Sequence, residues 1–335
     1  MIGGEVWNRL RLNPLLIVGP GLPKTHPMSG ASMGMPKPRP CALDIDAYLR
    51  DRTLAINRAL NRFLPLSRTK PATLHRAMRY SLFAGGKRIR PALCLAAAEA
   101  CGGRDDAAMP LACAVECIHT YSLIHDDLPA MDDDDYRRGK LTNHKVFGEG
   151  VAILAGDALL TQAFEVATQC PGWPRYSHRI LIQELTRAAG SLQLIAGQVA
   201  DLEGEGRTVS AHELKYIHER KTSALLGCAV RLGGMSANCS LAQLNALTHF
   251  GYNVGLAFQV IDDILDVTQT TEQLGKTAGK DTAAQKATYP AILGLDRSKQ
   301  IARRLTNRAY AALRPFKGSA GALEGLARFL LERDR

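Results

Sequence analysis

From residue 44 to the C-terminus, hydrophobic residues recur at spacings of three and four with little interruption. Such spacing places them on one face of an α-helix, and it is found at 46–64, 72–84, 91–101, 107–128, 151–169, 177–200, 211–232, 240–267 and 290–313. Glycine-containing segments separate these stretches, whereas the alternating β-branched runs typical of strands are missing from the sequence. We therefore expect one all-α domain over residues 44–335, preceded by a disordered N-terminal extension over residues 1–43.

The charge of the chain narrows the classes of partner. Its net charge of +10 is compatible with nucleic acid, an anionic membrane or small anionic molecules. The acids form two compact clusters and several bases stand at junctions between loops and helices, which favours polyphosphates bridged by metal ions. No hydrophobic run approaches the roughly 20 residues that span a bilayer. We expect no nucleic-acid binding and no stable membrane insertion.

The eight cysteines show no CxxC pair, and several of them lie within hydrophobic helical patterns. Such cysteines are typical of buried free thiols in a reducing compartment. We expect a cytoplasmic protein without disulfides or a zinc site.

Two clusters of aspartates lie on segments that are otherwise strongly hydrophobic. In the second cluster, Asp262 and Asp266 are four residues apart, so their carboxylates share one face of a helix. Two such carboxylates repel each other and are costly to bury unpaired. We expect them to bind Mg²⁺, which takes oxygen ligands and usually shares its coordination sphere with substrate phosphates.

The first cluster is less regular. It begins with Asp126 and Asp127 and continues over 132–135. Asp126 and Asp132 would point to different sides of an ideal helix, but Pro129 between them is expected to break or bulge the helix and let Asp132 turn back. We interpret the last two acids, Asp134 and Asp135, as a solvated helix end.

Basic residues form two further sets. The first is the turn Gly85–Pro91 (GGKRIRP), which leads into a helix expected to begin at Pro91. The free amides and the dipole of that helix start favour an anion. The second set comprises Lys221-Thr222, Lys276 and Lys280. Hydrophobic residues follow Lys221, so its ammonium group is expected to need an anion nearby.

Taken together, these motifs resemble the trans-isoprenyl diphosphate synthases. DDxxxxD (Asp126–Asp132) is followed by RRG (Arg137–Gly139), and DDxxD (Asp262–Asp266) lies downstream. The resemblance runs from about residue 45 to the C-terminus and includes the GGKRIRP turn, a GQxxDL run at 197–202 and the Lys-Thr pair. Within the family, the stretch 115–138 is most similar to bacterial farnesyl diphosphate synthases.

The resemblance implies a single large helical bundle of the isoprenoid synthase type, homodimeric, with a central active-site cavity. It implies Mg²⁺-dependent head-to-tail condensation of isopentenyl diphosphate with dimethylallyl and then geranyl diphosphate, giving farnesyl diphosphate and pyrophosphate. Three Mg²⁺ ions are expected in each site when substrate is bound.

The resemblance also implies a role for individual residues. Those expected to bind metal are Asp126, Asp132 and Asp262. Those expected to bind isopentenyl diphosphate are Lys87, Arg90, His119 and Arg138, and those expected to bind the allylic diphosphate are Arg137, Lys221, Thr222, Gln259 and Lys276. The catalytic set is Asp126, Asp132, Arg137, Lys221 and Asp262. Product length is expected to be set by Tyr121 as the floor of the pocket, with Ser122 as the next position.

Other functions stay open at this point. A geranyl or geranylgeranyl diphosphate synthase would carry the same motifs. A terpene cyclase would share the first aspartate cluster, but it normally replaces the second with an Asn/Ser/Glu triad and needs no second diphosphate site. A non-catalytic regulatory subunit would be expected to lose metal ligands, whereas both clusters are intact here.

Overall fold

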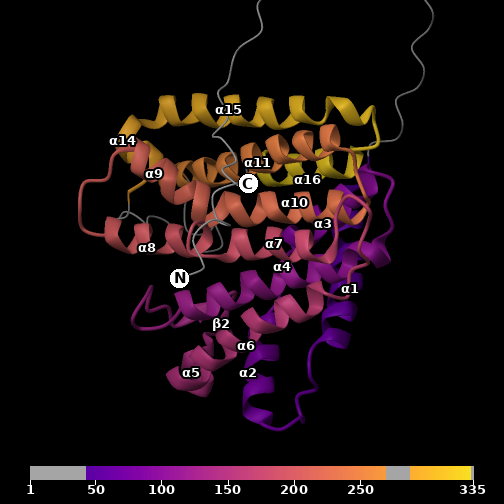
Figure 1. The fold of residues 1–335 in the computed structure, drawn as a ribbon. Coiled ribbons are helices and arrows are strands. Elements are labelled where there is room, and N and C mark those ends of the chain that lie inside the picture. Colours follow the sequence, from indigo (N-terminus) through magenta and orange to yellow (C-terminus); the bar gives the residue numbers. More distant parts are fainter. Residues whose placement is uncertain (1–42, 269–286, 333–335) are drawn as a thin grey trace, which may run out of the picture. The chain divides into compact units, whose positions relative to one another are not determined.

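The computed structural model describes residues 43–268 and 287–332, and within them helices dominate (Figure 1). The α-helices are α1 (Ile45–Phe63), α2 (Ala72–Leu82), α3 (Ile89–Ala100), α4 (Asp105–Asp126), α5 (Asn143–Phe147), α6 (Glu149–Ala167), α7 (His178–Ala189), α8 (Leu194–Gly204), α9 (Ala211–His218), α10 (Ala224–Ser236), α11 (Leu241–Thr268), α14 (Tyr289–Leu293), α15 (Leu295–Ala312) and α16 (Gly321–Leu331). The described residues also form a π-helical turn η1 (Glu219–Ser223) and a 3₁₀ turn η2 (Arg314–Phe316). The strands β1 (Tyr136–Arg137) and β2 (Lys140–Leu141) pair in a small antiparallel hairpin. The expected all-α fold is confirmed.

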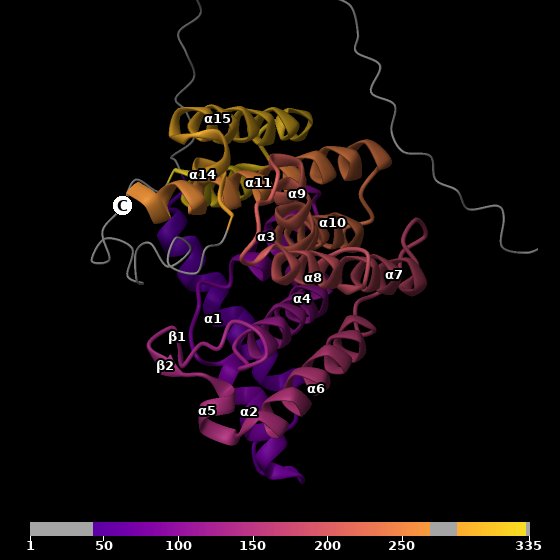
Figure 2. The ribbon, with the colours of Figure 1, turned by 90° about the vertical axis from the view of Figure 1, so that its left-hand side faces the viewer.

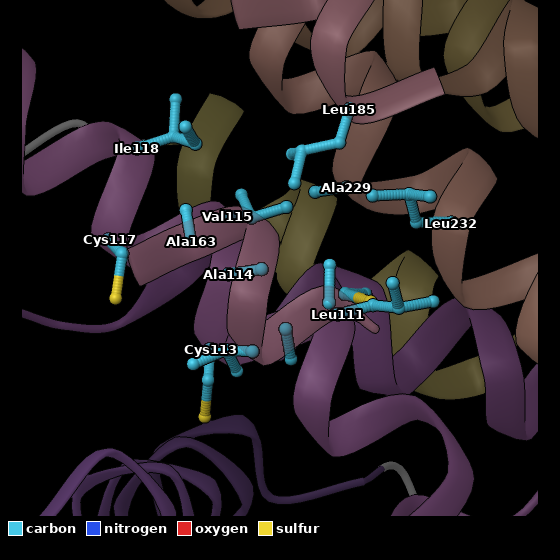
Figure 3. Close-up of a cluster of buried hydrophobic side chains, with 14 of the residues drawn as sticks. Leu111, Cys113, Ala114, Val115, Cys117, Ile118, Ala163, Leu185, Ala229 and Leu232 are labelled. Carbon is cyan, nitrogen blue, oxygen red and sulfur yellow. The ribbon is translucent and has the colours of Figure 1, made fainter. Parts of the chain in front are cut away.

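Helix α4 forms the centre of one hydrophobic core. It is hydrophobic on nearly all sides, as expected of a helix that neighbours surround, and it packs against α3, α6 and α10. Figure 3 shows its Leu111 and Val115 among Ala163 of α6, Leu185 of α7 and Ala229 of α10. Because the first aspartate cluster follows directly on this helix, it is held inside the bundle.

Helix α11 belongs to a second core and carries the other aspartate cluster. It packs between α10 and α15 (Figures 1 and 2), with Phe250 fully buried. Helix α16 closes the same core against α3, and the sequence analysis did not include it among the expected helices. The two clusters therefore come from different packed helices.

Several expected boundaries were wrong. The stretch 177–200 is two helices, because the chain leaves helical geometry at Gly190 and resumes it at Leu194. The stretch 290–313 is broken at Gly294, where φ is +81°. Helix α3 begins at Ile89, two residues earlier than expected, after Arg88 in a left-handed conformation.

Among the described residues, two helices, α4 and α6, are long and apolar enough to cross a membrane by length and composition alone. In α4, 78% of the apolar stretch is buried, so the hydrophobic core accounts for the composition of this helix. In α6 only 39% of the corresponding stretch is buried, which leaves much apolar surface exposed.

The expected extension over 1–43 lies outside the described residues apart from Leu43, and Lys276 and Lys280 lie outside them as well.

Candidate active site

A cavity of about 510 Å³ is lined by residues of α3, α4, α6, α8, η1 and α10. It brings together expected site residues from separate motifs, namely Arg90, His119, Tyr121, Ser122, Asp126, Lys221 and Thr222. Much of the remaining lining is hydrophobic, including Met131, Leu160, Leu194, Ile195, Val199, Leu202 and Leu225. The cavity thus joins charged groups to a space suited to a hydrocarbon chain.

The first aspartate cluster folds back on itself. Helix α4 ends at Asp126, and the backbone N–H of Asp132 donates a hydrogen bond to the carbonyl oxygen of Asp126 over 2.8 Å. The expected break at Pro129 is therefore present. The pKa of the Asp126 carboxyl is raised to about 6; burial is the main cause and the negative charge of Asp132 contributes, while Lys221 opposes the shift. A cation bound beside Asp126 and Asp132 would offset the repulsion between their carboxylates.

Asp127 lies beside Asp126 but has a different environment. Its Oδ1 accepts a hydrogen bond from Nε of Arg137 over 2.6 Å, and the side chain is buried. This ion pair ties the β1–β2 hairpin to the end of α4.

The interpretation of Asp134 and Asp135 as a helix end was wrong, because α4 ends at Asp126 and both residues lie in the loop before β1. Asp135 there pairs with Lys145 at 2.7 Å.

Two arginines, Arg90 and Arg138, lie close to His119 of α4. Nη1 of Arg90 donates to Nε2 of His119 over 3.2 Å, which requires an unprotonated Nε2. Burial, followed by the charges of Arg90 and Arg138, holds the pKa of His119 well below its usual range. Burial also lowers the pKa of Arg90 to about 10, and Nε of Arg90 has no hydrogen-bond partner among the described residues. An anion bound here would stabilise all three side chains.

The basic residues of the glycine turn before α3 have different environments. Arg88 is buried and pairs with Glu116 at 2.6 Å, so it has a structural role. Lys87 is exposed, with Nζ 4.7 Å from the centroid of the Phe329 ring, and does not line the cavity. The Arg138 guanidinium packs over Gly86, where an added Cβ would lie 2.5 Å from Nη1. Glycine at this position therefore permits the approach of Arg138.

The π-helical turn η1 carries Lys221 and Thr222 into the cavity. Nζ of Lys221 donates to Oδ2 of Asp201 over 2.6 Å. Helix α8 can approach closely because position 197 is glycine: a Cβ there would lie 2.2 Å from the backbone nitrogen of Lys221. The anion that Lys221 was expected to need is thus already present as a carboxylate of the GQxxDL run.

The second aspartate cluster lies on α11. Asp263 is buried and accepts a hydrogen bond from the backbone N–H of Tyr289 over 2.9 Å. Asp266 is also buried, and its Oδ2 has no hydrogen-bond partner in the described part of the chain. Asp262 and Gln259 are half-buried on the same helix and are not among the residues that line the cavity.

The two clusters offer ligands that fit a hard divalent cation. All are carboxylate oxygens, the donors that Mg²⁺ prefers. Burial is the main reason that the pKa of Asp126 is raised, and Oδ2 of Asp266 has no hydrogen-bond partner among the described residues; a bound cation would stabilise the ionised form of both carboxyls.

Two contributors to the site received no role from the sequence. One is Asp201, which accepts a hydrogen bond from Lys221, and the other is His125, which lines the cavity. Nε2 of His125 lies 3.0 Å from the carbonyl oxygen of Ile153 on α6, and its ring packs edge-on against Tyr121. An added Cβ at Gly156 would lie 2.1 Å from Nε2, so this glycine gives the ring its space. Asp201 could have been found from the GQxxDL run, whereas no sequence signal pointed to the contact of His125 with α6.

Known proteins resemble this chain in sequence and in fold. The model of the family described as polyprenyl synthetase matches residues 71–317. The chain is 50% identical over 288 residues to a dimethylallyltranstransferase from Fischerella ambigua (strain UTEX 1903), which covers 85% of this chain and 83% of the relative. It is 49% identical over 298 residues to a chloroplastic geranylgeranyl pyrophosphate synthase from Catharanthus roseus, with 88% and 82% covered. A solved FPP/GFPP synthase from Zymomonas mobilis matches with a TM-score of 0.75 at 33% identity, over 87% of this chain and all of that one.

The chain therefore belongs to the polyprenyl synthetase family. The resemblance to trans-isoprenyl diphosphate synthases is confirmed, and the protein is a prenyltransferase of isoprenoid biosynthesis that acts on isoprenyl diphosphates.

Proposed function

We propose that the protein condenses isopentenyl diphosphate with dimethylallyl and then geranyl diphosphate, and releases farnesyl diphosphate. The observation that carries this proposal is the position of Tyr121. Its ring lines the cavity, and it precedes Asp126 by five residues, about 7–8 Å along the helix. It is also held against His125 at a centroid distance of 5.8 Å. A chain growing away from the aspartates would meet this ring, and a bulky side chain there limits its length.

Two groups of basic side chains suit two diphosphates. Arg90, Arg138 and the uncharged His119 form the set that makes no hydrogen bond to a carboxylate among the described residues, and with Lys87 we assign them to isopentenyl diphosphate. Lys221 and Arg137 both interact electrostatically with Asp126, so we assign them to the allylic diphosphate beside the metal-binding cluster. Thr222, Gln259 and Lys276 complete the second set.

Mg²⁺ would be held by Asp126, Asp132 and Asp262, and we propose three ions in each site. The bound ions would supply electrostatic stabilisation of the departing pyrophosphate. The protein contributes the rest through position and environment. Its cationic side chains orient the two diphosphates, and its hydrophobic lining excludes water from the reacting carbons.

Geranylgeranyl diphosphate is the second candidate product, because the Catharanthus relative at 49% identity carries that name. Purified protein incubated with Mg²⁺, isopentenyl and dimethylallyl diphosphates, followed by mass spectrometry of the products, separates these possibilities. We expect farnesyl diphosphate as the main product. A geranyl or geranylgeranyl product would contradict the assigned chain length, and complete inactivity would contradict the proposed condensation reaction.

We also propose that the active form is a cytoplasmic homodimer joined through α6. Ile153 and Leu154 of this hydrophobic helix are 44% and 58% exposed, and exposed apolar patches of this kind mark interaction surfaces. Light scattering of the purified protein should give twice the mass of the chain. Leu154→Glu should lower that mass, because a charge would then have to be buried in the contact.

A further inference from the structure

Two cysteines far apart in the sequence meet at one end of the bundle. Cys101 follows directly after α3, and Cys239 lies in the connection between α10 and α11. A Cβ added at Gly234 would lie 3.2 Å from Sγ of Cys239 and 3.9 Å from Sγ of Cys101, so both sulfur atoms pack over the same glycine. The adjoining backbones are also in contact, since a Cβ at Gly103 would lie 2.6 Å from Cβ of Ala237.

The surroundings of this thiol pair favour a negative charge on one sulfur. The Tyr176 hydroxyl lies 3.8 Å from Sγ of Cys239 and donates to its carbonyl oxygen over 3.0 Å. A hydrogen bond from the Cys101 thiol lowers the pKa of Cys239 to about 7; burial opposes this shift, and Tyr176 and Arg231 support it. The pKa of the donor Cys101 is raised correspondingly. The pair therefore favours a thiolate on Cys239 beside a thiol on Cys101.

The other cysteines in the described residues lack this combination. Burial raises the pKa of Cys94, Cys113, Cys117, Cys170 and Cys228, which keeps their thiols protonated. Figure 3 shows two of them, Cys113 and Cys117, on the core helix α4. Thiolates, rather than thiols, are the reactive nucleophiles. Of the described cysteines, Cys101 is the one that is not fully buried, so the pair has one partly exposed member, whereas Cys239 is buried.

We propose that Cys101 and Cys239 form an oxidative modification site at which a peroxide converts the two thiols into a disulfide. The Cys239 thiolate attacks one oxygen of hydrogen peroxide, an S–O bond forms, the O–O bond breaks, and the departing hydroxide takes a proton and leaves as water. The Cys101 sulfur then attacks the sulfur of Cys239. The S–S bond forms, the S–O bond breaks, and the second hydroxide leaves as water with the Cys101 proton. Two thiols are oxidised and one peroxide is reduced.

The disulfide would tie the end of α3 to the connection between α10 and α11. Neither cysteine lines the cavity, and a cross-link between distant parts of the chain stabilises mainly by restricting the unfolded state. We therefore expect oxidation to raise the melting temperature and to leave turnover unchanged. This consequence does not depend on the identity of the product.

The test uses the full chain treated with hydrogen peroxide, followed by non-reducing peptide mapping and mass spectrometry. We expect a Cys101–Cys239 cross-linked peptide, lighter by two hydrogen atoms, that disappears after treatment with a reductant. Cys101→Ser should stop at a sulfenic acid on Cys239, which dimedone labels, and Cys239→Ser should give neither species. Cys228→Ser, a matched change at a buried cysteine outside the pair, should still form the cross-link.

A cross-link between other cysteines, Cys41 included, or earlier oxidation of Cys94 or Cys228, would overturn the proposal. So would the absence of any cross-link in the unmodified chain after peroxide has oxidised its accessible methionines. Peptide mapping of the unmodified chain decides the matter even if a variant fails to fold.

Discussion

Nζ of Lys221 and Oδ2 of Asp201 lie 2.6 Å apart and join two motifs that stand on different helical elements. The lysine is carried by the π-helical turn η1 and the aspartate by α8. Lys221 also lowers the pKa of Asp126, so its charge acts on the first aspartate cluster as well. Asp201 thus fixes the direction of a cation assigned to the allylic diphosphate.

Removing this cation should weaken use of the allylic substrate selectively. A charge-assisted hydrogen bond contributes about 1.5–3 kcal/mol, so we expect Lys221→Met to lower kcat/KM for geranyl diphosphate by roughly 10- to 100-fold. The KM for isopentenyl diphosphate should change little. Asp201→Asn keeps the lysine and should have the smaller effect. Steady-state kinetics with each substrate varied in turn measure the difference, and equal losses for both substrates would contradict the assignment.

A substitution at Asp126 should abolish activity without lowering the stability of the protein. Asp126→Asn removes a proposed metal ligand, so turnover should be lost. It also removes a buried carboxylate whose pKa is raised to about 6 by burial. Without Mg²⁺ the variant should therefore melt at the same or a higher temperature than the unmodified protein. A variant that unfolds would show that the carboxylate is structural, and one that keeps its turnover would remove Asp126 from the metal-binding set.

The sequence predicted the general arrangement because the signals for it are local. The hydrophobic character of α4 on all sides placed the first cluster inside a bundle, and Pro129 predicted the turn that returns Asp132 to Asp126. Contacts between distant segments could not be predicted in this way. The pairing of Asp127 with Arg137, or of Arg88 with Glu116, depends on how the helices pack.

The glycine turn shows the limit most clearly. Its three basic residues, Lys87, Arg88 and Arg90, look equivalent in the sequence, yet one is exposed, one is paired in the core and one lines the cavity. The left-handed conformation of Arg88, with φ of +48°, helps to decide which residue points in which direction. No pattern of residue types encodes that backbone angle, because Arg88 is not a glycine.

His119 should make the stability of the protein depend on pH. Its pKa is held well below its usual range by burial and by the charge of Arg90. Below about 6.5 the unfolded chain takes up a proton at this side chain while the folded protein does not. Stability should therefore fall as the pH is lowered from about 7 to 5. His119→Asn should show a shallower fall in urea unfolding experiments over this range, and an identical pH profile would contradict the prediction.

Tyr121 should control the length of the product. Its ring lines the cavity together with hydrophobic residues such as Leu160, and it is packed against His125. Truncation in Tyr121→Ala would open space beyond the ring, so we expect the main product to shift from farnesyl to geranylgeranyl diphosphate or longer chains. Turnover should fall little, because the side chain takes no part in the chemistry. Mass spectrometry of the products measures the shift.

Tyr121→Phe is the matched control, because it keeps the ring and loses only the hydroxyl. Its product should stay at farnesyl diphosphate, which would show that bulk rather than hydrogen bonding stops elongation. If Tyr121→Ala still released farnesyl diphosphate, the floor would have to lie elsewhere. Ser122 is then the next position to change, because it also lines the cavity and its hydroxyl donates to the carbonyl oxygen of His119 over 3.0 Å.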